Sequence, residues 1–255
     1  AEQAYGGKIG SAFEIKDAYD SVEMAINILV ANDKSISMDA SPEQARQNIE
    51  KMRGWLALIP TQTRRTGEMD QLQQFSTPPH FAYVAAWALG LEETDVGLEP
   101  SSGLGGIAVF MKKGGKSVYL NELSERRRAM LDQLRIGPPA TGFDAGSIHA
   151  IMLPLIKNGT MEQPTVVGMN PPFSNNAAGR KDLLTGAKHI EEALRLLPQG
   201  GRLVAIVGEG MSFDAPTYKP WWDKIRAKYD VRANIHVDGR EYSKYGTTFS
   251  NRLLI

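Results

Sequence analysis

Apolar positions near the start of the chain recur with the period of a helix. Between residues 11 and 30 they fall on one helical face, which is typical of an amphipathic helix. Ser41-Pro42-Glu43 is a helix-start signal, and a second amphipathic stretch follows it. The pattern therefore predicts an N-terminal helical segment, residues 1–70, that packs against or caps the domain expected at residues 71–255.

From residue 95 onward, short apolar runs alternate with helical stretches. Such alternation predicts an α/β fold, because strands joined by helices lie parallel in one sheet. A last apolar run, 251–255, resembles an unfinished strand and suggests a piece cut from a longer polypeptide. The other predicted strands end at Glu99, at Asn121 and near 143–145, or cover 164–169, 202–208 and 231–237.

Asn170-Pro171-Pro172-Phe173 directly follows the β-branched run at 164–169. Prolines lack the N–H group that a sheet needs, so the pair ends the strand and leaves the motif at its carboxyl edge. In an open α/β sheet that edge is where ligands bind. The simpler alternative is a proline turn in which Asn170 caps and Phe173 packs in the core.

The residue types in this motif suit one chemical task, the activation of a planar amine. The lone pair of an exocyclic base nitrogen or a carboxamide nitrogen is delocalised, so attack on a methyl donor needs acceptors on its N–H bonds. Asn170 can supply a side-chain carbonyl, and Pro171 can supply a main-chain carbonyl from a segment that the next proline holds extended. Phe173 offers a flat apolar face on which a ring can stack.

A glycine-containing loop follows the first predicted strand at residues 100–106. Glycines there let the backbone turn from strand to helix and approach a ligand closely. The loop is neither the GxGxxG dinucleotide fingerprint nor a phosphate loop, since no Lys-Ser or Lys-Thr follows it. Taken alone, a loop that needs glycine only for its geometry is a reasonable interpretation.

Three further positions could bind parts of a nucleoside-containing ligand. Glu122 directly follows the second strand, where an acid in doubly wound folds accepts hydrogen bonds from both ribose hydroxyls. Asp144 could accept a hydrogen bond from an adenine amino group, although Gly142 and Gly146 also fit an ordinary turn. Thr77 stands at a predicted helix start, where free N–H groups could bind a carboxylate or the hydroxyl could simply cap the helix.

The overall composition narrows the class of protein. Lys plus Arg and Asp plus Glu each number 29, so no global basic field indicates nucleic acid, and any DNA contact must be local. No apolar run reaches the length of a membrane span, and the absence of cysteine fits a reducing cytosol. No metal is expected, because the histidines share no ligand spacing and are interpreted as structural or surface residues: His80, His149, His189 and His236.

Charged clusters elsewhere have simple structural interpretations. Ser124 is expected to cap a helix in which Arg126, Arg127 and Arg128 form a solvent-exposed face. Residues 174–181 lack periodicity, and we expect a loop beside the site that carries Arg180 and Lys181.

Taken in order, these motifs resemble the S-adenosylmethionine-dependent amino-methyltransferases of DNA, specifically the N6-adenine group. That family carries a Thr-Pro-Pro element, a Glu-Pro-plus-glycine loop, an acid after the second strand, an Asp after the third, and Asn-Pro-Pro-Phe or Tyr after the fourth. The resemblance covers residues 71–255 and implies a Rossmann-like, mostly parallel sheet of seven strands with an antiparallel last strand. The matching elements are Thr77-Pro78-Pro79, residues 99–106, Glu122, Asp144-Ala145 and Asn170 to Phe173.

The resemblance also implies S-adenosyl-L-methionine as the cofactor. Direct displacement at its sulfonium methyl would depend on alignment and polarisation, with no metal and no covalent enzyme intermediate. The implied catalytic positions are Asn170, Pro171, Pro172 and Phe173. The implied cofactor-binding positions are Phe75, Thr77 and Pro78 at the methionine end, Glu99, Ser101, Gly103 and Gly105 along the methionine and ribose, Glu122 at the ribose hydroxyls, and Asp144 and Ala145 at the adenine edge.

The implied acceptor is N6 of an adenine flipped out of DNA. A Thr-Pro-Pro element before the glycine loop is similar to the arrangement in which a target-recognition domain follows the catalytic domain, and nothing in these 255 residues resembles such a domain. Recognition of DNA would then come from linked downstream domains, as in restriction–modification enzymes or in the large phage and plasmid proteins that residues 242–255 resemble. The expected location is cytoplasmic. Ser101 and Ser102 depart from the family pattern, which has an aromatic or small residue before its glycines.

Two other functions fit the same residues. Asn-Pro-Pro-aromatic motifs also serve the carboxamide nitrogen of protein glutamine and the amines of RNA bases. A catalytically idle module that binds cofactor or DNA inside a larger phage or plasmid protein is the alternative from a different class.

Overall fold

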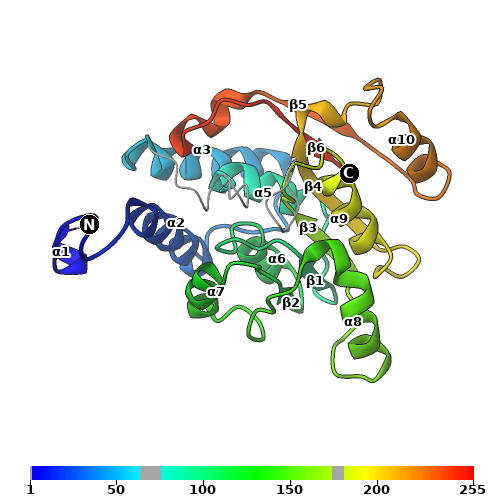
Figure 1. Cartoon of the computed structure of the whole chain (residues 1–255), viewed down its shortest axis with the longest axis horizontal. Helices are drawn as coiled ribbons and strands as arrows, with labels where there is room; N and C mark the ends of the chain where they lie inside the picture. The colour runs from blue at the N-terminus through cyan, green and yellow to red at the C-terminus, as the bar shows by residue number, and fades with distance from the viewer. Residues whose placement is uncertain (1, 64–75, 174–180) are drawn as a thin grey trace.

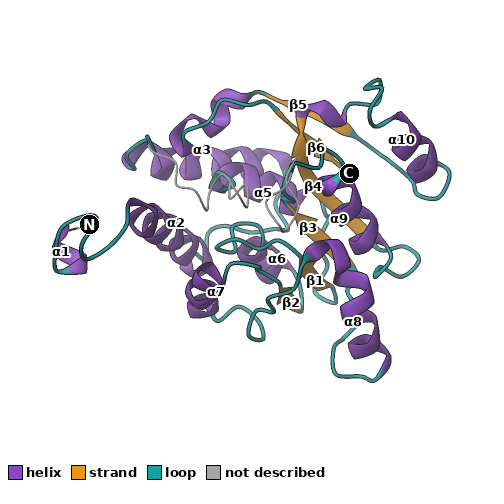
Figure 2. Ribbon diagram, viewed as in Figure 1, coloured by secondary structure: helices purple, strands orange, loops and turns teal. Residues whose placement is uncertain are grey.

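The computed structural model describes residues 2–63, 76–173 and 181–255, which form a mixed β-sheet with helices on both faces (Figure 1; Figure 2). The strands are β1 (Val96–Glu99), β2 (Ser117–Leu120), β3 (Val166–Met169), β4 (Arg202–Gly208), β5 (Asn234–Val237) and β6 (Asn251–Leu254). The helices are α1 (Glu2–Tyr5), α2 (Ile15–Asn32), α3 (Pro42–Leu58), α5 (Pro79–Trp87), α6 (Ala108–Gly114), α7 (Glu125–Leu131), α8 (Ile148–Lys157), α9 (Thr185–Leu194) and α10 (Lys219–Arg226). Short 3₁₀ helices are η1 (Asp132–Leu134), η2 (Ala145–Ser147), η3 (Glu209–Met211) and η4 (Gly239–Tyr245).

The sheet order is β2-β1-β3-β4-β6-β5. Strands β2, β1, β3 and β4 are parallel, whereas β6 pairs antiparallel with both β4 and β5. The α/β class and the mostly parallel, Rossmann-like sheet with an antiparallel last strand are therefore confirmed. The chain runs from β1 to β2 on one side and then crosses from β2 to β3 on the other side of β1, which creates a switch point between β1 and β3.

One expected strand does not form, so the described residues contain a six-stranded sheet rather than a seven-stranded one. Near 143–145 the chain makes only an isolated bridge between Asn121 and Thr141 before it enters η2. Pro138 and Pro139 stand just ahead of this bridge and have no N–H groups to extend a ladder.

Side chains of the sheet alternate between two apolar layers. Val166, Val204 and Ile206 face the layer that contains α2, α3, α5 and α6. Val167 and Ala205 face the opposite layer, which contains α8, α9 and α10. Both faces are covered, which explains why the strands are continuous apolar runs in the sequence.

The N-terminal helices pack on the first of these layers. Helix α3 starts as predicted, with the Ser41 side chain accepting a hydrogen bond from the Gln44 N–H. At its other end, Lys244 Nζ donates to the carbonyl of Ile59 at 2.9 Å, so η4 caps α3. Helix α2 lies beside α6 and α7 in Figure 1, and Asn27 Nδ2 donates to the Leu104 carbonyl at 2.8 Å. The division of the chain at residue 70 stays a prediction.

Within the described ranges, no helix combines the length and the apolar character needed to cross a bilayer.

Candidate functional site

The carboxyl ends of β1, β2 and β3 meet beside the switch point. Glu99 is the last residue of β1, Glu122 follows β2 by two positions, and Asn170 follows β3 directly. Because parallel strands end at the same edge of a sheet, these three polar side chains share one edge. We take this edge as the candidate site; the sequence had proposed all three residues for it, and their roles stay predictions.

Asn170 is joined to the Thr-Pro-Pro element. Its Nδ2 donates to Oγ1 of Thr77 at 2.9 Å, a contact between residues 93 positions apart. Because Nδ2 of Asn170 points at Thr77, Oδ1 of the same amide points away from Thr77. The Thr77 hydroxyl does not cap α5, because the N-cap position is Pro78 and makes no side-chain cap. The capping interpretation of Thr77 is therefore wrong.

The rest of the Asn-Pro-Pro-Phe motif lies against two glycines. A Cβ atom on Gly186, at the start of α9, would stand 3.2 Å from the Pro172 carbonyl oxygen. A Cβ atom on Gly208, the last residue of β4, would stand 3.5 Å from Cγ of Phe173. Phe173 is half-buried and belongs to neither apolar layer, so its ring borders the sheet edge rather than the core.

Glu99 is buried, with 2% of its surface exposed. Its Oε2 accepts a hydrogen bond from the Ala108 N–H at 2.8 Å, where α6 begins. A carboxyl at a helix N-terminus satisfies an otherwise unpaired donor. Burial nevertheless raises the pKa of the Glu99 carboxyl well above its ordinary value, with the nearby Glu122 charge adding to the effect.

Glu122 is held between the glycine loop and the start of α7. Its Oε2 accepts from the Gly103 N–H at 2.7 Å, and its Oε1 accepts from the Ser124 N–H at 2.8 Å. Gly103 has φ 55° and Gly105 has φ 82°, in the left-handed region that other residues rarely adopt. The loop therefore needs these glycines in order to present its N–H to the carboxylate.

Asp144 occupies the other end of the site. Its Oδ1 accepts from the Gly146 N–H at 2.9 Å, which makes it the N-cap of η2. Its side chain is 46% exposed, and Oδ1 lies 3.8 Å from Nε2 of His189 on α9. Ala145 beside it is buried. This carboxylate is accessible to a ligand, as its predicted role requires, although the turn-forming role of Gly146 is also present.

His189 is a site neighbour that the sequence did not reveal. It is buried, and burial lowers the pKa of its imidazole, so the ring is neutral near pH 7. Among the described residues, its Nδ1 has no hydrogen-bond partner. Its position on the inner face of α9, next to the buried Ile190, was the only available signal.

The remaining predicted positions are distributed around the same edge. Ser101 is half-buried in the glycine loop, and Pro78 and Pro171 are buried. Phe75 and Arg180 lie outside the described residues, so their predicted roles stay predictions. Among the residues that the structure describes, no group of three or more His, Asp or Glu side chains is arranged to hold a metal ion.

Many solved structures share this fold. A protein assigned as an RNA methyltransferase from Pyrococcus horikoshii aligns with a TM-score of 0.53 and 15% identity, over 82% of this chain and 96% of that chain. The modification subunit of an assigned type I restriction enzyme from Vibrio vulnificus YJ016 aligns with a TM-score of 0.53 and 15% identity, over 83% of this chain and 48% of that chain. This chain thus spans about half of that subunit. No protein-family model matches the sequence, and no curated protein is similar to it. The likeness establishes a Rossmann-like fold that methyltransferases use.

Proposed function

We propose that this chain is an S-adenosylmethionine-dependent methyltransferase that methylates the exocyclic N6 of adenine in DNA. The observation that carries the proposal is the hydrogen bond between the side chains of Asn170 and Thr77. It lies at the edge of the sheet where β1 and β2 end and where Glu99 and Glu122 stand. This hydrogen bond joins the Asn-Pro-Pro-Phe motif, which suits an amine acceptor, to the Thr-Pro-Pro element, which suits the methionine end of the cofactor.

The residues at this edge fit the cofactor by their chemistry. Glu122 is oriented by two main-chain N–H groups, which hold its carboxylate ready to accept from ribose hydroxyls. The left-handed glycines at 103 and 105 keep side chains out of the loop that would follow the methionine and ribose. Thr77 and Pro78 would border the methionine end, and Asp144 with Ala145 would border the adenine edge.

When bound, S-adenosyl-L-methionine supplies an electrophilic methyl group on a sulfonium. The task of Asn170 and Pro171 is then to accept hydrogen bonds from the acceptor amine through one side-chain and one main-chain oxygen. Phe173, at the sheet edge beside Gly208, would stack on the acceptor ring. No residue here needs to form a covalent bond with the substrate, because alignment of nitrogen, methyl and sulfur is sufficient.

The acceptor class is the finer part of the proposal. The similarity to a restriction-enzyme modification subunit favours DNA, and that subunit is longer than this chain, which is compatible with recognition by linked domains. The similarity to a protein assigned as an RNA methyltransferase favours the RNA alternative to the same degree. The order of the motifs, with Thr77-Pro78-Pro79 before the glycine loop, favours DNA. A cytoplasmic location stays a prediction.

Transfer of labelled methyl groups tests the proposal. We would incubate the chain, and a longer parent protein where one exists, with labelled S-adenosylmethionine and with unmethylated DNA, tRNA or a glutamine-containing protein. Wild type is expected to label DNA at adenine, and Asn170→Ala is expected to lose about 100-fold or more of that activity while binding the cofactor normally. Asn32→Ala, which replaces an exposed asparagine on α2, is the matched control and should retain full activity.

The outcomes separate the alternatives. If tRNA or protein is labelled and DNA is not, the proposed acceptor is wrong, whereas the proposed methyl transfer stands. Cofactor binding without labelling of any acceptor, even by the parent protein, would support the idle module. An Asn170→Ala variant with ordinary activity would remove Asn170 from the acceptor site.

A further inference from the structure

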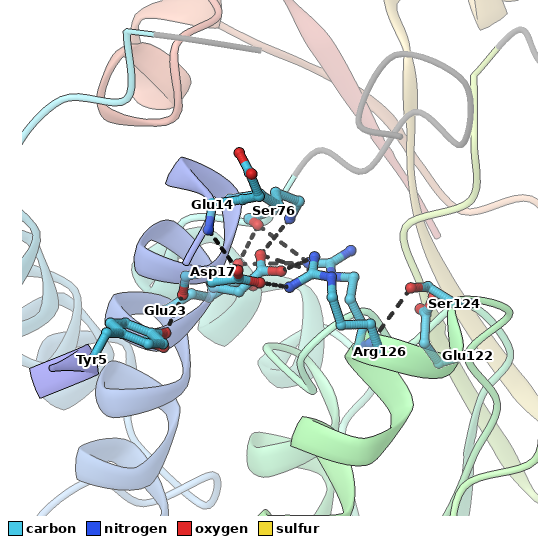
Figure 3. Close-up of polar contacts among 12 residues, drawn as sticks. Tyr5, Glu14, Asp17, Glu23, Ser76, Glu122, Ser124 and Arg126 are labelled. Atoms are coloured by element: carbon cyan, nitrogen blue, oxygen red, sulfur yellow. Dashed lines mark hydrogen bonds and ion pairs between the residues drawn. The ribbon is translucent and has the colours of Figure 1, made fainter. Parts of the chain in front are cut away.

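A group of charged side chains is buried between α2 and α7, beside the glycine loop. Lys16, Asp20 and Glu23 come from α2, and Arg127 comes from α7. Each of the four has at most 6% of its surface exposed. We call these four residues the buried charge cluster. Figure 3 labels Glu23 of this cluster together with its neighbours Ser76, Asp17 and Arg126. The sequence had predicted a packing role for α2 and an exposed face for Arg127, and the structure corrects the second expectation.

Arg127 is held by the carboxylates of α2. Its Nη2 lies 3.6 Å from Oε2 of Glu23, and its Nε lies 4.0 Å from Oδ1 of Asp20. Lys16 forms an ion pair with Asp20 one helical turn away. The cluster therefore contains two cationic and two carboxylate side chains, which meets the rule that buried charges must be paired.

The cluster also contacts both segments expected to border the methionine end of the cofactor. Ser76, immediately before Thr77, donates its hydroxyl to Glu23 and accepts from Nη2 of Arg127 at 3.5 Å. On the other side, a Cβ atom on Gly103 would stand 3.3 Å from Nη1 and Nη2 of Arg127. The guanidinium thus lies between the Ser76–Thr77 stretch and the glycine loop.

Stability alone does not account for this arrangement. Replacing a buried ion pair with apolar side chains of similar volume is often neutral or stabilising, because desolvation offsets much of the attraction. A packing element would be served as well by apolar residues. A guanidinium placed between two ligand-binding segments has a directional role, since its planar N–H groups fix the neighbours that they contact.

We propose that Arg127, oriented by Asp20 and Glu23 of α2, is a positioning residue for the amino-acid end of S-adenosylmethionine. It sets the distance between Ser76–Thr77 and Gly103, and it makes α2 a part of the cofactor site. The inference rests on the proposed function. It adds to that function a requirement for the N-terminal helix, which the sequence had assigned only to packing.

Two ligands distinguish this role from general support of the fold. S-adenosylhomocysteine carries the amino acid, whereas 5′-methylthioadenosine has the same nucleoside and sulfur without it. In Arg127→Gln, affinity for S-adenosylhomocysteine should fall about 10-fold or more, equal to about 1.4 kcal/mol, while affinity for 5′-methylthioadenosine changes less than about 2-fold. Calorimetric titration of the intact chain measures both.

Three further variants complete the design. Ser76→Ala leaves all charges in place, so it should disturb folding less than Arg127→Gln does. It should weaken the binding of S-adenosylhomocysteine and leave that of 5′-methylthioadenosine unchanged. Arg127→Lys keeps the positive charge but lacks the planar fork of the guanidinium. Its affinity for S-adenosylhomocysteine should lie between those of wild type and Arg127→Gln. Arg195→Gln is the matched control, because Arg195 pairs with Glu192 beside α9 and is no part of the buried charge cluster, and the ratio of the two affinities should stay that of wild type.

The result that overturns the inference is an equal change for both ligands, or no change, in Arg127→Gln and Ser76→Ala. A wild-type chain that binds neither ligand would overturn the proposed function itself, and the inference with it. Binding of both ligands by wild type, with unchanged ratios in every variant, would overturn only the inference.

Discussion

At the Glu122 end of the candidate site, carboxylates are buried and held by main-chain N–H groups, whereas at the Asp144 end a half-exposed carboxylate faces a buried histidine. The Glu122 end comprises Glu99, Gly103, Glu122 and Arg127, each in contact with a second element of the fold. The Asp144 end depends on one hydrogen bond to Gly146 and on the approach of His189.

The difference shows where order is established before a ligand arrives. Groups at the Glu122 end already have partners, so changes there should affect the free energy of unfolding as well as binding. The side chain of Asp144 is 46% exposed, and Gly146 is the hydrogen-bond donor to it among the described residues. A change of Asp144 should therefore affect binding with little effect on folding. Variants at the two ends test this contrast.

The largest effect is expected from Gly105→Ala at the Glu122 end. Gly105 has φ 82°, which costs an alanine about 1–2 kcal/mol. Its new Cβ atom would also stand 2.9 Å from the fully buried Leu131, and crowding of this kind adds about 1–3 kcal/mol. Urea unfolding would measure both costs together.

Gly200→Ala is the control for this change. Gly200 has the same φ of 82°, but no atom lies within 4 Å of its added Cβ, so only the conformational cost applies. Equal losses in the two variants would mean that the Glu122 end is not tightly packed.

A second prediction concerns Glu99 and pH. The folded protein keeps a proton on Glu99 at pH values where the unfolded chain, with the ordinary value of 4.5, releases it. The free energy of unfolding of wild type should therefore fall, relative to Glu99→Gln, as pH rises from 4.5 towards the folded pKa, by at most about 1.4 kcal/mol per pH unit. Urea unfolding of both proteins between pH 4.5 and 8 measures the difference. A constant difference would show that Glu99 titrates in the folded state as it does in the unfolded chain.

His189 should give the opposite sign at the other end. Burial lowers the pKa of its imidazole below the ordinary 6.5, so the unfolded chain binds a proton that the folded protein rejects. Wild type should lose stability relative to His189→Gln as pH falls below 6.5 towards the folded pKa. The change of stability with pH should be smaller than for Glu99, because the negative charge of Asp144 favours the imidazolium and offsets part of the effect of burial. The positive charge of Lys188 acts in the same direction as burial. The same unfolding series, extended to pH 5, checks the sign.

The smallest effect on folding is expected from Asp144→Asn. The free energy of unfolding should change by no more than about 0.5 kcal/mol, as for most surface positions. Affinity for 5′-methylthioadenosine should fall about 3- to 10-fold, since one charged acceptor for the adenine amino group is lost. Asp230→Asn, at an exposed surface pair with Arg232, is the matched control for charge. Unchanged nucleoside affinity in Asp144→Asn would remove this residue from the adenine edge.

The local sequence was sufficient to place the ends of the strands. Glu99 and the Asn-Pro-Pro-Phe motif stand where apolar periodicity ends and proline or glycine begins, and these signals are carried by neighbouring residues. Ser41 also starts a helix as predicted, because its capping partner Gln44 is three positions away. The expected strand near 143–145 failed because the prolines just before it outweighed the apolar residues.

The burial of Arg127 and the position of His189 could not be predicted, because both depend on contacts with residues that are distant in the sequence. Arg127 stands in a run of three arginines, which is the pattern of an exposed face. Its buried partners Glu23 and Asp20 lie more than 100 positions earlier in the sequence. His189 shows the same difficulty, because Asp144 reaches it from another connection between strands. Periodicity reports that a helix has an inner face, but not which polar group it will meet there.

The place of β6 between β4 and β5 has a consequence for synthesis of the chain. Both neighbours bond to β6, and residues 251–254 emerge from the ribosome after both of them. Strand β5 therefore has no sheet to join, and one edge of β4 stays uncovered, until those residues have been translated. During that interval the nascent protein carries an open β-edge, so a pause in elongation before Asn251 would favour pairing with other chains over completion of its own sheet.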